Sequence, residues 1–312
     1  MLIHKNTFEI TNSGINPDSD FIDEKCGVIR SGGVSGRAME ITHRATISEN
    51  NIFIDQNSCW TGGIATWKGS DNRIFDNVFD FGSLNGRAII LDSDADRNEV
   101  YSNHFIMRCL NGDPRFLDPA STRTLQSSAI QIRGPADDNK IYNNVVEISP
   151  DSRRTMAVRY GGTAEEDGSG MPGDNLIHHN RFSSNYRVIN VGTVAGGGRF
   201  DSNTLVPVGD AMAISISAKK TIEGLIFSNE VVENRGAGQS TITIRGPSDS
   251  SVSNLRICGF SPELSEQDID TTVDNWGTLN GSSCLEPVEG SDPPPPPPPP
   301  SRPLPPSNLN VE

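Results

Sequence analysis

The sequence predicts an all-β chain that folds as a right-handed parallel β-helix, a solenoid of about nine to ten coils. Three observations support this prediction. A hexapeptide with the pattern apolar-x-x-Asn-x-apolar recurs nine times, a short apolar strand precedes most copies, and no stretch keeps a helical apolar period over three turns. A unit of this size cannot bury its apolar face alone, but it can when it stacks on its neighbours.

The hexapeptide copies are spaced like the coils of a solenoid. Successive copies lie 23 to 44 residues apart, and several gaps are in the mid-twenties. We expect each strand to pair with its equivalent one coil away, at roughly 4.8 Å. The copies begin at Ile3, Ile47, Ile74, Val100, Ile141, Ile177, Phe200, Ile226 and Leu255.

The Asn at the fourth position of each copy predicts an internal ladder. An Asn at a bend can bond through its amide to the Asn of the next coil and to the turn backbone. We therefore interpret these residues as scaffold and not as a site. In the ninth copy Cys258 replaces Asn, and we expect the ladder to end there. The Asn column is Asn6, Asn50, Asn77, Asn103, Asn144, Asn180, Asn203 and Asn229.

The upstream strands alternate apolar and other residues, which indicates one face turned inward. Turn residues such as Gly134-Pro135 and Gly246-Pro247 separate these strands from the hexapeptides. The strands are centred on residues 39–41, 64–66, 89–91, 130–132, 156–158, 189–191, 214–216 and 242–244.

Residues 1–260 resemble the right-handed β-helix repeat of the pectin-lyase-like superfamily. The resemblance rests on stretches such as Ser128-Ala129-Ile130-Gln131-Ile132, which leads to the hexapeptide of residues 141–146. It implies the fold but selects no activity, because the superfamily includes polysaccharide lyases, glycoside hydrolases, epimerases, tailspikes and adhesins. The Lys-Ser and Arg-His-Gly strings of the alginate lyase and chondroitinase B group are absent, as is the Tyr-Gly-Asp-Pro-His-Asp string of mannuronan epimerases.

Composition shifts after the repeats predict further segments. We expect an irregular C-terminal cap at 261–290 and a stiff Pro-rich linker at 291–306. Residues 307–312 resemble the start of a fibronectin type III module, which implies an extracellular or cell-surface location. Because Ile3 already lies inside a hexapeptide, we also expect natural sequence before Met1 that caps the first coil.

The net charge of −14 argues against a nucleic acid partner, whose phosphates require a basic face. The sequence contains no run of eighteen apolar residues, so it does not predict a membrane-spanning helix. The five cysteines include Cys258 and Cys284, which flank the last coil and could be joined in an oxidising compartment.

The residues that directly follow the upstream strands predict a column on the outer face. Trp67 suits stacking on a sugar ring, the guanidiniums of Arg133 and Arg159 suit a carboxylate or sulfate, and Asp92 suits a cation or proton transfer. The resemblance implies that an arginine or lysine removes the substrate proton, and it leaves Arg133 and Arg159 both open. The alternative is a row of solvated charges with a weak Asp92–Arg133 ion pair. The column is Thr42, Trp67, Asp92, Arg133, Arg159, Gly192, Ser217 and Arg245.

A calcium site is predicted at Asp92, Asp94 and Asp96, because alternate carboxylates in a turn can hold this ion. The loop is not an EF-hand, since Arg97 and Asn103 stand where glycine and glutamate are required. Carboxylate pairs for an inverting glycosidase could come from Asp92 and Asp94 or from residues 165–167, and nothing selects one. We interpret His178 and His179 as surface residues.

These observations predict an extracellular protein that acts on or binds an acidic polysaccharide. The most concrete form is a β-eliminating lyase that uses Arg133 or Arg159 as base, Trp67 for stacking and Asp92 for a cation. The alternative is a non-catalytic adhesin or a tailspike-like rod that binds glycans.

Overall fold

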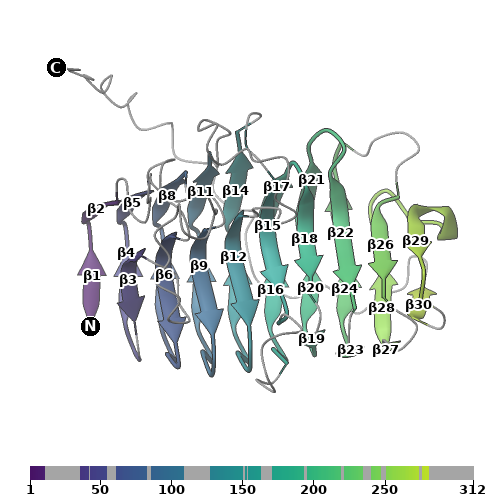
Figure 1. Cartoon of the computed structure of the whole chain (residues 1–312), viewed down its shortest axis with the longest axis horizontal. Coiled ribbons are helices and arrows are strands. Elements are labelled where there is room, and N and C mark those ends of the chain that lie inside the picture. The colour runs from purple at the N-terminus through teal and green to yellow at the C-terminus, as the bar shows by residue number, and fades with distance from the viewer. Residues whose placement is uncertain are drawn as a thin grey trace, which may run out of the picture.

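The structure is a computed structural model. It describes residues 1–10, 36–41, 43–54, 61–82, 86–108, 127–149, 152, 154–162, 171–192, 195–218, 221–234, 240–246, 251–273 and 276–280. Almost all regular structure among them is parallel β-strand, stacked along one rod (Figure 1). The predicted all-β, right-handed parallel β-helix is confirmed. Within this part of the chain, no helix is long and apolar enough to cross a membrane.

Three long sheets form the walls of the rod, and each coil passes from sheet C to sheet A to sheet B. Sheet A consists of β1 (Leu2–His4), β4 (Thr46–Ser48), β7 (Arg73–Phe75), β10 (Glu99–Tyr101), β13 (Lys140–Tyr142), β16 (Leu176–His178), β20 (Arg199–Asp201), β24 (Ile226–Ser228), β28 (Leu255–Cys258) and β30 (Gly277–Asn280). Sheet B consists of β2 (Thr7–Ile10), β5 (Asn51–Ile54), β8 (Val78–Phe81), β11 (His104–Met107), β14 (Val145–Ile148), β17 (Arg181–Ser184), β21 (Thr204–Pro207) and β25 (Val231–Val232).

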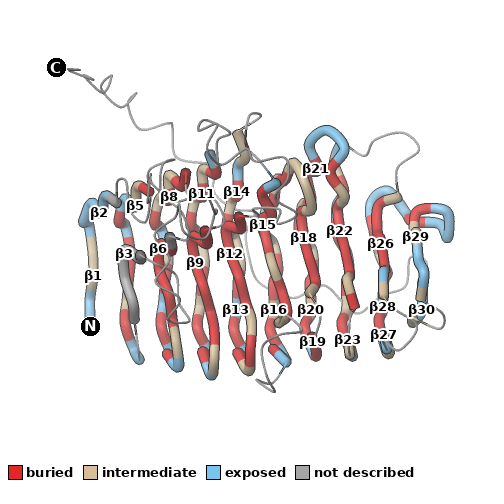
Figure 2. The backbone as a smooth tube through the Cα atoms, viewed as in Figure 1, coloured by how far each residue is buried: buried red, intermediate tan, exposed pale blue. Residues whose placement is uncertain are grey.

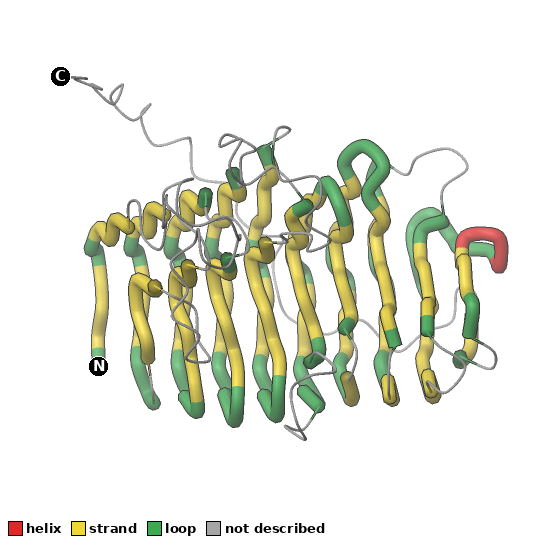
Figure 3. The backbone as a smooth tube through the Cα atoms, in the orientation of Figure 1, coloured by secondary structure: helices red, strands yellow, loops and turns green. Residues whose placement is uncertain are grey.

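Sheet C holds the strands predicted upstream of the hexapeptides. It consists of β3 (Gly36–Ile41), β6 (Thr61–Trp67), β9 (Arg87–Asp92), β12 (Ser127–Arg133), β15 (Thr155–Tyr160), β18 (Arg187–Val191), β22 (Met212–Ser217), β26 (Ile242–Arg245) and β29 (Ile269–Thr271). A short sheet of β19 (Ala195–Gly196), β23 (Thr221–Glu223) and β27 (Ser251–Ser253) lies between sheets C and A in the later coils. Loops turn the corners between the walls (Figure 3).

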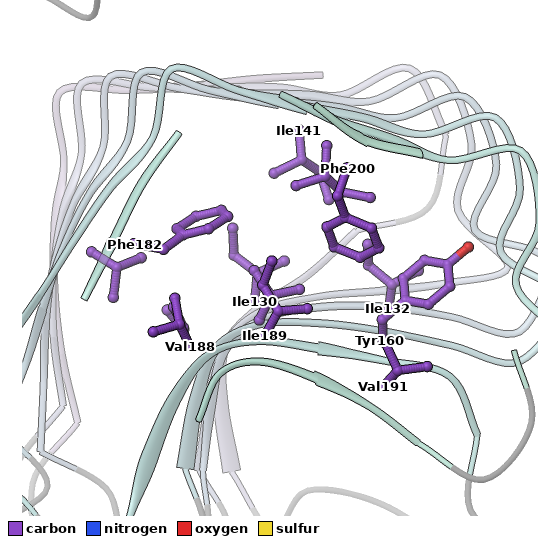
Figure 4. Close-up of a cluster of buried hydrophobic side chains, with 14 of the residues drawn as sticks. Ile130, Ile132, Ile141, Tyr160, Phe182, Val188, Ile189, Val191 and Phe200 are labelled. Carbon is purple, nitrogen blue, oxygen red and sulfur yellow. The ribbon is translucent and has the colours of Figure 1, made fainter. Parts of the chain in front are cut away.

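The interior is a continuous column of aliphatic and aromatic side chains. Inward positions of neighbouring coils pair in register, as with Ile130 and Val158 in sheet C, and both are fully buried. Rings also stack along the axis inside the rod, with Phe79 and Phe105 at 4.7 Å between centroids. Figure 4 shows Phe182 and Phe200 directed at the same interior as Ile130 and Ile132. The sheets thus bury their inner faces against one another (Figure 2).

The predicted asparagine ladder is present from Asn6 to Asn203. Each amide donates to the Oδ1 of the next Asn, as from Asn103 to Asn144 at 3.0 Å. The residue before each Asn adopts a positive φ, which bends the chain at the corner between sheets A and B, as at Ser102 with φ 52°. The other steps join Asn6, Asn50, Asn77, Asn103 and, beyond Asn144, Asn180 and Asn203.

The last two rungs of this ladder differ from the prediction. Phe200 pairs with Phe227 and not with Ile226, so Asn229 falls at the corner position with φ 56°. Asn203 donates instead to Oε1 of the buried Glu230, which occupies the ladder position. One coil further, Cys258 pairs with Ser228, so it does not take the Asn position either. The physical reason is that Phe227, and not Ile226, fills the interior below Phe200.

A second asparagine ladder, which we did not predict from the sequence, runs along the corner between sheets C and A. Asn72 accepts from the backbone N of Ala45, and its amide donates to Asn98 at 2.8 Å. The bonds continue from Asn98 to Asn139 at 3.0 Å and from Asn139 to Asn175 at 2.8 Å.

The second ladder ends at a tyrosine. The amide of Asn175 donates to the hydroxyl of Tyr160 at 3.2 Å, and this hydroxyl donates to the carbonyl of Gly196 at 2.9 Å. Gly198 is required beside it, because a Cβ at that residue would lie 2.7 Å from the Tyr160 oxygen.

Strands continue past residue 260, where the sequence predicts only an irregular cap. β29 and β30 pair with β26 and β28, and a 3₁₀ turn, η2 (Glu266–Asp268), precedes β29. The predicted linker and the fibronectin-like start lie outside the described residues. Cys258 is disulfide-bonded. The four other cysteines lie outside the described residues, so pairing with Cys284 stays a prediction.

Candidate functional site

The outer face of sheet C carries three columns of side chains that cross successive coils. The first, near the start of each strand, is Gly62, Arg87, Ser128, Met156, Arg187 and Met212. The second, in mid-strand, is Ala65, Ile90, Gln131, Arg159, Asn190, Ser215 and Thr243. The third, at the strand ends, begins with Trp67, Asp92 and Arg133.

Trp67, Asp92 and Arg133 lie side by side on three successive coils, where the sequence places them. The indole Nε1 of Trp67 donates to Asp92 Oδ2 at 2.5 Å, and Nε of Arg133 donates to the same oxygen at 2.6 Å. The hydroxyl of Ser93 donates to Asp92 Oδ1 at 3.1 Å. The Asp92 side chain is only 6% exposed, and that of Arg133 is 26% exposed. Asp92 therefore holds the other two side chains in place and leaves their outer edges accessible.

Arg159 does not follow Arg133 in the third column, contrary to the predicted alignment. Arg159 pairs with Gln131, and Tyr160 pairs with Ile132, so Gly161 is the residue at the level of Arg133. The prediction took residues 156–158 as the inward triplet, but Val158 is the residue that pairs with Ile130. Arg159 remains on the same outer face, one column away and one coil further along the rod. It is partly exposed.

Two further arginines of this face were missed from the sequence because they begin their strands. Arg87 is 8% exposed, and its Nε donates to Gln131 Oε1 at 2.5 Å. Arg187 is less buried, and its Nη1 donates to Asn190 Oδ1 at 2.8 Å. With Arg133 and Arg159, four successive strands (β9, β12, β15 and β18) each place one guanidinium on the outer face of sheet C. A search for arginine in every strand, without a fixed offset, could have found them.

Arg187 also belongs to a smaller cluster at the corner between sheets B and C. Its guanidinium carbon lies 4.6 Å from the centroid of the Tyr186 ring, and that of Arg154 lies 5.2 Å from the same centroid. Burial lowers the pKa of Arg187, and the nearby charge of Arg154 lowers it further. Nε of Arg187 is buried and has no hydrogen-bond partner among the described residues. The cluster combines two positive charges with one aromatic ring.

Asp92, Asp94 and Asp96 do not fit the predicted calcium site. Both oxygens of Asp92 already accept hydrogen bonds from Trp67, Arg133 or Ser93. Asp94 is exposed, and Asp96 Oδ1 accepts from the backbone N of Asp137 at 2.9 Å. Among the described residues, no group of three or more His, Cys, Asp or Glu side chains lies close enough to hold a metal ion.

The outer face of sheet A carries a row of stacked rings. Phe75, Tyr101, Tyr142 and His178 stack with centroids 4.8, 4.9 and 5.2 Å apart. Since the ring faces cover one another, only their edges are open, and a sugar ring cannot stack on them. His178, which we expected at the surface, is 6% exposed, and burial lowers its pKa to about 4. Residues 165–167 lie outside the described part of the chain.

Comparisons with known proteins return a likeness of fold. No family model matches the chain, and no curated protein matches its sequence. The crystal structure of a pectate lyase from Bacillus sp. N165 in complex with trigalacturonate is similar, with a TM-score of 0.45 and 15% identity. The similarity covers 79% of this chain and 71% of that chain.

Proposed function

We propose that the protein is an extracellular β-helix protein that binds an acidic polysaccharide on the outer face of sheet C. The observation that carries the proposal is the series Arg87, Arg133, Arg159 and Arg187, one guanidinium from each of four successive strands. These charges gather on one face of a chain whose net charge is −14. Guanidinium groups bind carboxylate and sulfate through paired hydrogen bonds, and Trp67 adds an apolar ring beside them.

The disulfide of Cys258 supports the extracellular location. Disulfide bonds persist in oxidising compartments and are rare in the cytosol.

In its most concrete form, the proposed activity is β-elimination on a polyuronate. One guanidinium neutralises the substrate carboxylate, which makes the proton on the adjacent carbon easier to remove. A second group then takes this proton as the glycosidic oxygen leaves. Arg133 and Arg159 are the candidates for the base, and they lie one column and one coil apart. Asp92 supports the site by orienting Arg133 and Trp67.

The alternative is a non-catalytic rod that binds glycans, such as an adhesin. One contact favours it: Nε of Arg133 already donates to Asp92. A guanidinium that is engaged with a carboxylate suits the binding of an anion better than proton removal.

The test is an assay on a panel of polyuronates, including polygalacturonate, with ultraviolet absorbance reporting an unsaturated product. A lyase gives absorbance that Arg133→Gln or Arg159→Gln reduces by about 100-fold or more. The control is Arg256→Gln, an exposed arginine on sheet A with the same charge change. Binding without product favours the non-catalytic reading. Absence of binding to every acidic glycan contradicts the proposal.

A further inference from the structure

Within the described part of this acidic chain, Arg154 and Arg187 are two arginines without a carboxylate partner. Neither guanidinium forms an ion pair within the described part of the chain. Most described arginines outside sheet C do form an ion pair. Examples are Arg181 with Glu233 at 2.7 Å and Arg97 with Asp71 at 2.8 Å. Two like charges beside one ring repel each other, and a bound anion would offset this repulsion.

The cluster is held in position by its backbone. The turn at residues 184–187 is tied to the preceding coil by Asn185, whose Oδ1 accepts from the backbone N of Thr155 at 3.2 Å and whose amide donates to the carbonyl of Ser152. The hydroxyl of Ser184 donates to the carbonyl of Thr155 at 2.5 Å. These bonds flank Arg154 on both sides. The fold therefore fixes the backbone that carries both arginines, and their guanidiniums meet at the same ring.

The donors of Arg187 are only partly used. Its Nη1 donates to Asn190 Oδ1 at 2.8 Å, which fixes the plane of the guanidinium. Its Nε is buried and has no acceptor within the part of the chain that the structure describes. A buried donor without an acceptor is rare in folded proteins, and a bound anion or ordered water normally satisfies it.

We infer that Arg154, Tyr186 and Arg187 form an anion-binding site for the carboxylate or sulfate group of a glycan. The identity of the glycan rests on the proposed function, whereas the site itself rests on the geometry of the cluster. From Arg133 the cluster lies two coils away, roughly 10 Å along the rod and roughly 16 Å across sheet C. It thus provides a second charged contact at the far edge of the same face, and it selects acidic over neutral sugars.

The experiment is calorimetric titration of the whole chain with polygalacturonate oligomers, with a sulfated oligosaccharide and with inorganic sulfate. We expect Arg154→Gln and Arg187→Gln each to weaken binding of the acidic oligosaccharide about tenfold, the effect of one charge-assisted hydrogen bond. Tyr186→Leu should weaken it without any change in net charge. The control Arg256→Gln should change it by about twofold or less. Thermal unfolding of each variant checks that the fold is kept.

Equal losses in Arg154→Gln, Arg187→Gln and Arg256→Gln indicate bulk charge and overturn the inference. Unchanged affinity in the first two variants also overturns it, while the proposed function stands. If the wild type binds no acidic glycan but binds inorganic sulfate, and both variants lose it, the anion site is supported and the proposed function fails.

Discussion

Asn203 donates an amide hydrogen to Oε1 of Glu230 at 2.9 Å, so the longer asparagine ladder ends on a carboxyl group. Glu230 is fully buried, and no described residue forms a hydrogen bond with its Oε2. Burial raises the pKa of this carboxyl well above its usual value, with the Asn203 amide acting in the opposite direction. The folded protein therefore holds a proton on Glu230 at a pH where the unfolded chain has lost it.

We predict that Glu230→Gln stabilises the protein at neutral pH. The raised pKa of Glu230 means that its contribution to stability is complete below the pKa of an unfolded glutamate and is lost as the pH rises toward the folded value. Glutamine keeps an acceptor for Asn203 and carries no charge. Its amide can also donate, so the free energy of unfolding at pH 7 should rise by about 1–3 kcal/mol. Urea unfolding from pH 5 to pH 8 measures it.

Glu233→Gln is the matched control, three residues away. Glu233 pairs with Arg181, and the hydrogen bond from this arginine lowers its pKa. This variant should change stability by less than about 1 kcal/mol and in the destabilising direction. A stabilising effect confined to Glu233→Gln would contradict the assignment.

Replacing an asparagine by alanine should reduce the free energy of unfolding more in the interior of the ladder than at its exposed end. Asn103→Ala removes an amide that donates to Ile74 O at 2.9 Å, Tyr101 O at 3.0 Å and Asn144 Oδ1 at 3.0 Å. Since several buried groups lose their partners, we expect a loss of about 3 kcal/mol or more. Asn6→Ala, at the exposed end of the same column, should lose less than about 1 kcal/mol. Chemical denaturation measures the free energy of unfolding of both variants, and equal losses would contradict a continuous ladder.

His178 should remain neutral to about pH 4. Burial, followed by the charge of His179, lowers the pKa of His178 to about 4. The unfolded chain takes up this proton near pH 6.5, so stability is lost as the pH falls from about 6.5 to about 4. His178→Phe keeps a ring in the stack and should reduce the fall in Tm over this range. An imidazole titration by NMR with its midpoint above pH 6 would be inconsistent with the buried stack.

Asp92, the last residue of β9 before the acidic turn, should stabilise the fold through its hydrogen bonds. Asp92→Asn leaves Trp67 and Arg133 without a charged acceptor, and we expect a loss of about 1–3 kcal/mol. Asp94→Asn, exposed in the same turn, should stay within about 0.5 kcal/mol. Millimolar calcium should leave Tm unchanged. If calcium raised Tm and Asp94→Asn abolished the increase, the turn would hold the calcium ion that the sequence predicts.

The repeats predicted most of the fold, and their failures have local causes. Ile226 and Phe227 are both apolar, so the eighth copy can be read in two registers, and only the stacking of Phe227 on Phe200 selects one. The second ladder was present in the sequence as Asn two residues before the apolar position, as in Asn98 before Val100.

The site was less predictable than the fold. Trp67, Asp92 and Arg133 were aligned correctly because each follows an unambiguous strand triplet. Residues 156–160 contain two overlapping triplets, and for this reason Arg159 was placed two residues too far along its strand, level with Arg133 and not with Gln131.

Local periodicity was enough to establish the coil, the inward face and the first asparagine ladder, because each depends on residues only a few positions apart. The partners of Asp92, the burial of Glu230 and the pairing of Arg154 with Arg187 around Tyr186 came only from the folded chain. Each of them depends on which coil lies above which, and on insertions of unequal length between coils. Register across coils is decided by the fit of side chains in the interior, and a linear pattern does not contain that fit.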